Sequence, residues 1–293
     1  DVAPTNLAAT AAPPERKPRD DEIDVFGLTH RGNVRKSNND HFLVAILHKK
    51  MDVLLTSLPG LADSSGREER VAIIGMVADG VGGSEAGEEA SRIALETVSE
   101  YLSTSLQAYY GASDAEGALQ KALQDAAMRT HERVREVAER RNDQRKRATT
   151  LTLIVGVWPW LYLLQVGDSR YYRFRDGVLT QVTRDQTFAQ DLIDAGALST
   201  DQAKDSPLKN VLSSAIGGDQ TAPVVTRFPS DWKNVHLACS DGLTKHVSDE
   251  RIRERLAGMT SARQACEALL QDALDGGGSD NITVLIARTV RRD

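Results

Sequence analysis

Apolar positions along the chain follow two different spacings, and each spacing predicts a kind of element. Short apolar runs, continuous or alternating and rich in β-branched residues, are typical of strands. We expect strands at Ile23–Leu28, Phe42–Leu47, Val71–Val77, Thr149–Val157, Leu161–Val166, Tyr171–Phe174, Val178–Val182, Val235–Ala238 and Ile282–Ile286. Because several of these runs are joined by tight turns, the sheets are predicted to be largely antiparallel.

Helical spacing appears in two long central segments and in a later, shorter pair. The first central helix is predicted at about Ala86–Ser105, and the second from the capping box Ser113-x-x-Glu116 to about Arg141. The later helices follow Ser248 and a second box, Ser261-x-x-Gln264. Amphipathic helices beside antiparallel strands predict an α+β fold, a four-layer α-β-β-α sandwich with two sheets packed together and helices outside.

Residues 148–167 carry no charge and could be mistaken for a membrane span. Pro159 would break a helix near the middle of this stretch, and several threonines reduce its apolar content. We therefore expect a hairpin of two buried strands that turns at Trp158-Pro159-Trp160, and no membrane span.

Two further segments lack an apolar period. Residues 1–21 contain four prolines and mixed charge, which predicts a disordered tail or a linker to another domain. Residues 49–70 are rich in turn-forming residues and are predicted to form a long surface loop. The remaining pattern predicts one domain over residues 22–293.

Composition narrows the class of protein. The chain has 293 residues, 40% of them apolar and 27% charged, which is typical of a globular protein. Its net charge of −6 gives no global basic field, so we expect no nucleic-acid partner. Two cysteines make no disulfide framework, which fits a reducing compartment, and we expect a cytoplasmic location.

Several predicted strands end in an aspartate beside small residues. These ends are Asp79-Gly80, Gly167-Asp168, Asp241-Gly242 and Ser279-Asp280, the last of which leads into a strand. An Asp-Gly pair can also be a plain hairpin turn, as we expect for Asp176-Gly177. Together, however, the four aspartates favour one acidic site. Crowded carboxylates repel one another and need a cation, and oxygen ligands select Mg²⁺ or Mn²⁺.

A basic loop precedes the second predicted strand and adds a cation to this set. Residues 29–40 contain Arg35, whose guanidinium could bind an oxyanion through two parallel hydrogen bonds. Taken alone, the same residue would more often be a solvated arginine in a loop. The motifs around Arg35 are what favour a functional role for it.

Seven short motifs occur in a fixed order and together carry a resemblance. They are Arg35-x-x-Asn38-x-Asp40, Val77-Ala78-Asp79-Gly80-x-Gly82-Gly83, Gly87-x-x-Ala90-Ser91, Thr149-Thr150-Leu151, Val166-Gly167-Asp168-Ser169-Arg170, Ser240-Asp241-Gly242-Leu243-Thr244 and Ser279-Asp280-Asn281-Ile282-Thr283. In this order the chain resembles the metal-dependent protein phosphatases of the PPM family (type 2C), in their bacterial form. The resemblance extends from about residue 22 to residue 290.

The resemblance implies a β-sandwich with two Mn²⁺ or Mg²⁺ ions in a cleft at one edge. It implies that Asp79 bridges both ions, that the Gly80 carbonyl binds the second, and that Asp241 and Asp280 bind the first. The resemblance also gives Asp168, together with Asp241, as the ligands of a weaker third ion.

The resemblance also implies an activity. Arg35 would grip the phosphate of phosphoserine or phosphothreonine in protein substrates, and a metal-activated water would hydrolyse it. Many bacterial members oppose a serine/threonine kinase, which implies a cognate kinase as a partner and a role in signal transduction. The segment from Gln186 to about Gln220 corresponds to the family's flap.

The chain departs from the family pattern at several positions. The family's acidic residue before Asp40, which holds a water of the second metal, is Asn39 here. Other departures are Ala148, Gln186 and Ser206, while Val81 replaces the histidine of many eukaryotic members, as it does in bacterial ones. Asn39 motivates an alternative from another class, a catalytically weak or silent module that binds phosphoproteins. Other phosphatase chemistries lack their motifs, since the chain has no Cys-x₅-Arg, no Asp-x-Asp and no Walker A loop.

Overall fold

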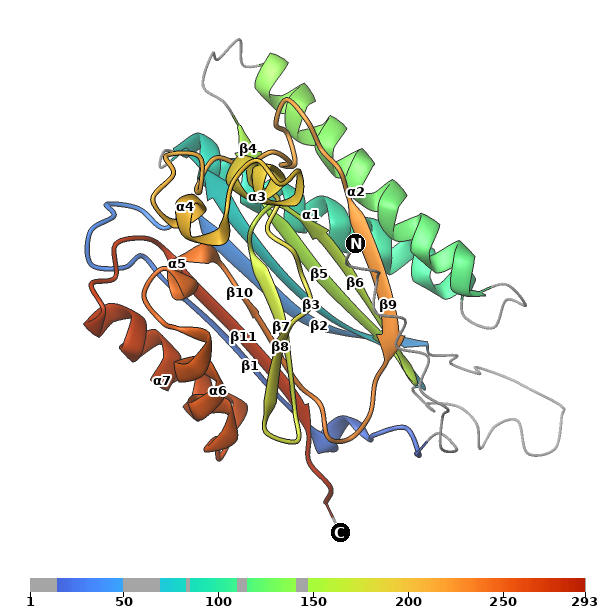
Figure 1. Ribbon diagram of the computed structural model, residues 1–293. Coiled ribbons are helices and arrows are strands. Elements are labelled where there is room, and N and C mark those ends of the chain that lie inside the picture. The colour runs from blue at the N-terminus through green and yellow to red at the C-terminus, as the bar shows by residue number, and fades with distance from the viewer. Residues whose placement is uncertain (1–14, 50–68, 83–84, 110–114, 141–146, 293) are drawn as a thin grey trace, which may run out of the picture.

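Two antiparallel sheets lie face to face, and each is covered on its outer side by helices (Figure 1). The computed structural model describes residues 15–49, 69–82, 85–109, 115–140 and 147–292. One sheet has the order β1 (Ile23–His30), β11 (Ile282–Thr289), β10 (Val235–Cys239), β7 (Arg170–Arg175) and β8 (Val178–Gln181). The other has the order β2 (Asp40–Lys49), β3 (Glu69–Val81), β5 (Leu151–Val157), β6 (Trp160–Val166) and β9 (Val224–Pro229), and the short β4 (Ala148–Thr149) pairs with the end of β3.

The helices divide between the two outer faces. Both long helices, α1 (Glu85–Tyr109) and α2 (Ala115–Arg140), cover the β2–β9 sheet. The opposite sheet is covered by α5 (Asp241–Thr244), α6 (Asp249–Ala257) and α7 (Ala262–Asp275). Two short helices, α3 (Phe188–Asp194) and α4 (Thr200–Lys204), lie between β8 and β9 in the chain, and a 3₁₀ turn at Asp20–Glu22 precedes β1. The predicted four-layer α-β-β-α sandwich is confirmed.

Side-chain alternation along β3 shows how the layers are filled. Ala72, Ile74 and Met76 pack in the apolar cluster under α1, while Val77 packs between the two sheets. Because successive side chains of a strand point to opposite faces, Asp79 continues the inter-sheet series of Val77. The chain thus ends an apolar strand with a carboxylate in the middle layer.

Most predicted elements are present, with corrected bounds. The uncharged stretch is the β5–β6 hairpin, in which Val157 pairs with Trp160, and no helix of the described residues is long and apolar enough to cross a membrane. Ser248 and Ser261 cap α6 and α7 as expected, although the Gln264 side chain accepts from the Thr260 amide rather than closing a box on Ser261. The Ser113 box lies outside the described residues, as does most of the predicted loop at 49–70.

Some elements were not predicted. These are strand β9 and the helices α3, α4 and α5. Each has at most seven residues, which is too short to show a long periodic pattern. Residues 15–21 were expected to belong to a disordered tail or linker, but they pack against the sandwich. The indole of Trp232 donates to the Arg16 carbonyl and that of Trp158 to the Glu15 carbonyl. These contacts fix the segment in a way that its composition does not reveal.

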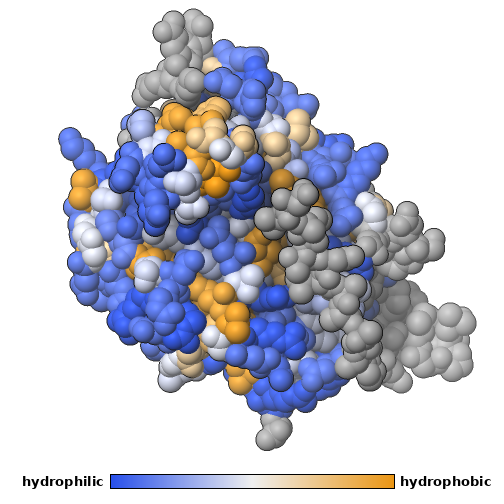
Figure 2. Space-filling view, viewed as in Figure 1, coloured by the Kyte–Doolittle hydropathy of each residue, from blue (hydrophilic) through white to orange (hydrophobic). Residues whose placement is uncertain are grey.

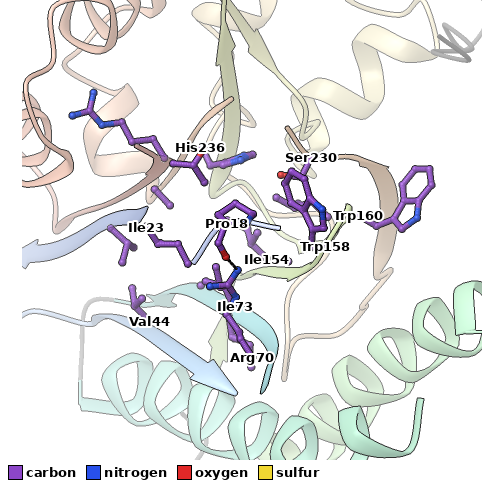
Figure 3. Close-up of a pocket in the computed structure, with 18 of the residues that line it drawn as sticks. Pro18, Ile23, Val44, Arg70, Ile73, Ile154, Trp158, Trp160, Ser230 and His236 are labelled. Atoms are coloured by element: carbon purple, nitrogen blue, oxygen red, sulfur yellow. Dashed lines mark hydrogen bonds between the residues drawn. The ribbon is translucent and has the colours of Figure 1, made fainter. Parts of the chain in front are cut away.

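The inter-sheet layer contains a cavity at the end near the N-terminal segment. It has a volume of about 100 Å³ and is lined mostly by apolar side chains, among them Ile23, Val44, Ile73, Ile154 and Trp158 (Figure 3). Arg70 and Pro18 border it, and a hydrogen bond joins the Arg70 guanidinium to the Pro18 carbonyl. The predicted site residues lie at the opposite end of the same layer.

Candidate metal centre

All seven predicted site residues line a single cleft of about 300 Å³ at one end of the sandwich. They arrive from five places in the chain: the β1–β2 loop, the end of β3, the β6–β7 turn, the start of α5 and the residues before β11. The cleft is lined by Arg35, Asn39, Asp79, Gly80, Asp168, Asp241 and Asp280, together with Thr150, Asn210, Lys245, Asn281 and three apolar or small residues. The ends of separate strands therefore converge as the sequence predicted, while the roles of the individual residues stay predictions.

The Thr149-Thr150 motif holds the end of β3 in place. The Asp79 amide donates to Thr150 Oγ1 at 3.0 Å, and the Asp79 carbonyl accepts from the Thr150 amide and from Thr149 Oγ1, each at 2.9 Å. Thr150 Oγ1 in turn lies 2.7 Å from Ser169 Oγ, next to Asp168. One hydroxyl network thus fixes the backbone of two aspartates that are far apart in the chain.

Gly80 and Gly242, the residues after Asp79 and Asp241, allow backbone segments to approach closely. A Cβ atom at Gly80 would lie 2.2 Å from the Gly87 carbonyl oxygen of α1, and one at Gly242 would lie 1.8 Å from the Asn281 carbonyl oxygen. Both distances are far below van der Waals contact, so a side chain at either position would push the aspartate-bearing segments apart. The glycine after each aspartate is therefore required by packing, whatever else it does.

Asp40 is a site residue to which sequence reasoning gave no role. It pairs with Asp79 across β2 and β3, and only 2% of its surface is exposed. Its Oδ2 accepts from Ser240 Oγ and from Thr283 Oγ1, both at 2.7 Å, while its buried Oδ1 accepts no hydrogen bond from the described residues. The register of β2 against β3, which the sequence does not specify, places this second carboxylate beside Asp79.

Burial and mutual repulsion raise the pKa values of the carboxylates. The pKa of Asp79 lies well above its ordinary value because of burial first and then the charges of Asp40 and Asp241. Burial, followed by the charge of Asp241, also raises the pKa of Asp168. Burial again dominates the raised pKa of Asp40. Such a cluster is costly as it stands and would be relieved by a cation.

The donor set fits hard divalent metal ions. Several carboxylates face one space, and buried oxygens of Asp40 and Asp241 have no hydrogen-bond partner among the described residues. Oxygen-only ligands suit Mg²⁺ and Mn²⁺. In the described parts of the chain, however, no three acidic, histidine or cysteine side chains converge closely enough to form a complete metal site as they stand.

Two cationic side chains lie among these carboxylates. Arg35 holds Asp280 through both ends of the carboxylate, with Nε 2.7 Å from Oδ1 and Nη2 2.8 Å from Oδ2. Lys245 Nζ lies 2.6 Å from Asp241 Oδ2 and 2.7 Å from Asp280 Oδ2. Burial raises the pKa of Asp280, but the hydrogen bonds from Lys245 and Arg35 outweigh it and lower the pKa overall. Lys245 received no role from the sequence, although it stands one helical turn after Asp241.

Asn39 lines the cleft but is held by the protein. Only 2% of it is exposed, and its Oδ1 accepts from Ser37 Oγ at 3.2 Å. Its amide donates to Asn281 Oδ1, and its carbonyl accepts from Ser91 Oγ and the Gly80 amide. The backbone of Asn39 therefore connects β2, β3 and α1 at the site.

The segment at 186–220 forms one wall of a larger, open depression of about 770 Å³ that shares Arg35, Asp168 and Asp280 with the cleft. Gln186 anchors this segment by accepting from the Gly167 amide and donating to the Ala222 carbonyl. Lys204 and Lys209 line the depression. The segment also exposes Phe188, Leu208 and Val211, and an apolar patch lies over this region in Figure 2.

Neither cysteine offers a nucleophile to this site. Cys239 and Cys266 are both buried. Burial raises the pKa of each thiol to about 12, so the reactive thiolate is scarce near neutral pH. The chemistry of the cleft must come from its oxygen ligands and cationic side chains.

Known proteins match both the sequence and the fold. Residues 62–276 match the family model for protein phosphatase 2C. Serine/threonine protein phosphatase PstP of Mycobacterium tuberculosis is 35% identical over 218 residues, which are 74% of this chain and 40% of PstP. Serine/threonine phosphatase stp of Listeria innocua is 32% identical over 212 residues, covering 72% of this chain and 82% of that protein.

A solved structure of one relative contains metal ions. The crystal structure of the catalytic domain of PstP in complex with two manganese ions matches with a TM-score of 0.70 at 28% identity, over 92% of this chain and 99% of that one. The present chain spans about 40% of the length of the full PstP protein.

Proposed function

The chain belongs to the protein phosphatase 2C (PPM) family of metal-dependent serine/threonine phosphatases, and on that premise we propose that it hydrolyses phosphoserine and phosphothreonine in proteins at the cleft around Asp79. The observation that carries this proposal is the carboxylate cluster. Asp40, Asp79 and Asp168 share one end of the middle layer and have raised pKa values. One buried oxygen of Asp40 and one of Asp241 accept no hydrogen bond from the part of the chain that the structure describes. Such a cluster is typical of a functional site.

We assign the ligands of two Mn²⁺ or Mg²⁺ ions to Asp79, the Gly80 carbonyl, Asp241 and Asp280. Asp168 would serve a third, weaker ion, and Asn39 would act on the second ion through a water. When bound, the ions supply a water of lowered pKa and neutralise charge on the phosphoryl oxygens.

The protein's own residues bind and position the substrate. Arg35 is 43% exposed at the rim of the cleft, where its planar guanidinium can hold two phosphoryl oxygens once it leaves Asp280. The lysines at 204 and 209 give the adjoining depression cations that would attract a phosphorylated segment. Ser240 and Thr283 orient Asp40 beside Asp79 through hydrogen bonds, which keeps the ligand carboxylates in place.

An alternative function is supported by one residue. The amide of Asn39 stands where the family has an acidic side chain, which favours a weak or silent module that binds phosphoproteins without turnover. Such a module would still bind metal and phosphopeptide. In either case the natural counterpart would be a serine/threonine kinase that phosphorylates the same proteins.

The deciding experiment measures release of phosphate from a phosphothreonine peptide with Mn²⁺ and then with excess chelator. The phosphatase proposal expects turnover that requires Mn²⁺ and disappears in Asp79→Asn. The matched control is Asp176→Asn, because Asp176 lies in the exposed β7–β8 turn and should leave turnover unchanged. Peptide binding without any Mn²⁺-dependent release would favour the silent module instead.

A further inference from the structure

The end of α5 carries a lysine that touches two of the proposed metal ligands. Lys245 Nζ lies 2.6 Å from Asp241 Oδ2 and 2.7 Å from Asp280 Oδ2, while its side chain is 27% exposed. The ammonium thus bridges carboxylates from two neighbouring strands of one sheet, since Asp241 follows the end of β10 and Asp280 precedes the start of β11. A role for Lys245 at the metal centre rests on the proposed function only in taking these carboxylates as metal ligands.

The fold fixes this contact. Lys245 follows Asp241 by four residues, and its amide donates to the Asp241 carbonyl at 2.9 Å, so both side chains lie on the same side of the turn. The intervening Leu243 is fully buried in the core cluster under the sheet, which anchors the turn. Asp280 lies just before β11, and Arg35 holds its carboxylate. Lys245 is therefore positioned by helical geometry and is not a loosely placed surface cation.

The same oxygens cannot serve the lysine and a metal ion at full strength. An ammonium at 2.6–2.7 Å is a direct, charge-assisted partner of both carboxylates. A divalent ion that binds Asp241 and Asp280 must displace Nζ or lie close to it, even if it uses Oδ1 of Asp241, which is unpartnered in the described part of the chain, and closeness costs repulsion between the two cations. Binding at this position thus includes the free energy of breaking two ion pairs.

We propose that Lys245 is an internal competitor for the metal held by Asp241 and Asp280, which stabilises the metal-free fold and weakens metal binding at that position. In the loaded protein the side chain moves off both carboxylates and remains in the wall of the substrate depression, which it also lines. Lys245 then acts as a positioning residue that sets the metal concentration at which the centre is complete.

A purely structural ion pair would behave differently. Its loss would destabilise the metal-free and the metal-loaded protein alike and would leave metal affinity unchanged. Competition instead predicts opposite effects in the two states, because the lysine stabilises only the state in which the metal is absent. The difference between these outcomes does not depend on catalysis.

The test measures Mn²⁺ binding by isothermal titration calorimetry in the whole chain, with Lys245→Met compared with the parent protein. We expect the dissociation constant at one position to fall by about 10-fold, since partners of metal ligands change affinity by about 10- to 100-fold. The matched control is Lys204→Met. It removes the same charge from the wall of the depression, but Lys204 pairs with Asp201 and touches none of the proposed ligands.

Thermal unfolding gives a second, independent readout. In chelator, Lys245→Met should unfold at a lower temperature than the parent, and its rise in melting temperature on adding Mn²⁺ should be larger. If that variant does not fold, Lys245→Gln, which keeps a polar side chain of similar reach, takes its place.

An unchanged dissociation constant in the Lys245 variant, or an equal tightening in Lys204→Met, would overturn the competition. A parent protein that binds no Mn²⁺ would overturn the metal centre itself and this inference with it. Tight binding by the parent without phosphatase activity would leave the competition standing and contradict only the proposed activity.

Discussion

Buried charges are paired with opposite charges at one end of the inter-sheet layer and lie beside like charges at the other. At the end near the N-terminal segment, the buried Arg70 guanidinium is paired with the Asp20 carboxylate and with the Pro18 carbonyl. Glu22, which is also buried, pairs with Arg16 and Arg19. At the cleft end, Asp40 and Asp79 lie beside each other and both have raised pKa values. Within the described ranges, Asp40 Oδ1 has no hydrogen-bond partner.

This contrast separates a structural from a functional use of charge. At the end near the N-terminal segment, oppositely charged side chains pair with each other and connect this segment to β3. Because these charges are already neutralised, no ligand is needed there. At the cleft end, the carboxylates repel one another and lower the stability of the metal-free protein, and a bound cation would offset this repulsion. We therefore expect substitutions of the cleft carboxylates to change activity while sparing the fold, and substitutions of the paired charges at the other end to do the reverse.

The largest effect is expected for Asp79→Asn. Loss of a charge shared by two metal ions should reduce Mn²⁺-dependent turnover on the order of 10³-fold, comparable with loss of a strong electrostatic contact in a transition state. The same change should raise the free energy of unfolding of the metal-free protein by about 1 kcal/mol, because one repelling carboxylate is gone. Steady-state kinetics and urea unfolding in chelator measure the two quantities.

Asp241→Asn is expected to lose turnover in the same way, and it tests the proposed metal ligands a second time. Full Mn²⁺-dependent activity in either variant would refute the assignment of ligands. A large loss of stability in the metal-free Asp79 variant would show that its carboxylate is structural and would erase the contrast between the two ends.

At the opposite end, Arg70→Met should destabilise the protein by about 2 kcal/mol, since it leaves the Pro18 carbonyl without its donor and removes one of the partners of the Asp20 carboxylate, another being His48. Mn²⁺ affinity and turnover of the folded fraction should stay unchanged. The control is Arg133→Met, because Arg133 makes an exposed ion pair on α2 and should change stability little. A shift in Mn²⁺ affinity in Arg70→Met would mean that the two ends are coupled.

The sequence could predict the contrast only in part. Apolar runs such as Val71–Val77 indicate the strands, and the aspartates at their ends indicate an acidic site, because both signals are local. The role of Asp40 depends on its register opposite Asp79, and that of Lys245 on an ion pair with Asp280, which lies 35 residues further along the chain. Such long-range pairings are set by tertiary packing and leave no local pattern.

The same reason explains what the sequence does not reveal at the end near the N-terminal segment. Residues 15–21 have the composition of a linker, yet Trp158 and Trp232 hold them through backbone carbonyls. Any residue type offers that carbonyl, so composition does not reveal the contact. Strand β9 was missed because its polar and charged residues interrupt the apolar signal and its partner strand β6 is distant in the chain.

A moderate effect is expected for Arg35→Ala. If the guanidinium holds phosphate equally in the ground and transition states, KM for a phosphopeptide should rise about 10-fold with a smaller loss in kcat. Arg31→Ala, an exposed arginine in the same loop that does not line the cleft, is the matched control. An unchanged KM with a large loss in kcat would place Arg35 at charge that develops only during the reaction.

The smallest effect is expected for Asn39→Glu. Restoring a carboxylate beside the second metal should lower the Mn²⁺ concentration at half-maximal activity, by about 10-fold or less because the contact runs through a water. Asn38→Glu adds the same charge one residue away, where it does not line the cleft, and should have less effect. Equal half-saturation in Asn39→Glu and the parent would mean that Asn39 does not act on the metal centre.

The most direct test of the contrast locates the metal by paramagnetic broadening in NMR spectra of the ¹⁵N-labelled chain during a Mn²⁺ titration. Arg70 and Asp79 are nine residues apart on β3, a separation of about 30 Å, and the indoles of Trp158, Trp160 and Trp232 lie at the Arg70 end. Our account predicts that amide signals at Asp79, Asp168, Asp241 and Asp280 broaden first, at less than one equivalent of Mn²⁺, while the three indole signals stay sharp. Indole signals that broaden first, or cleft amides that remain sharp at several equivalents, would contradict it.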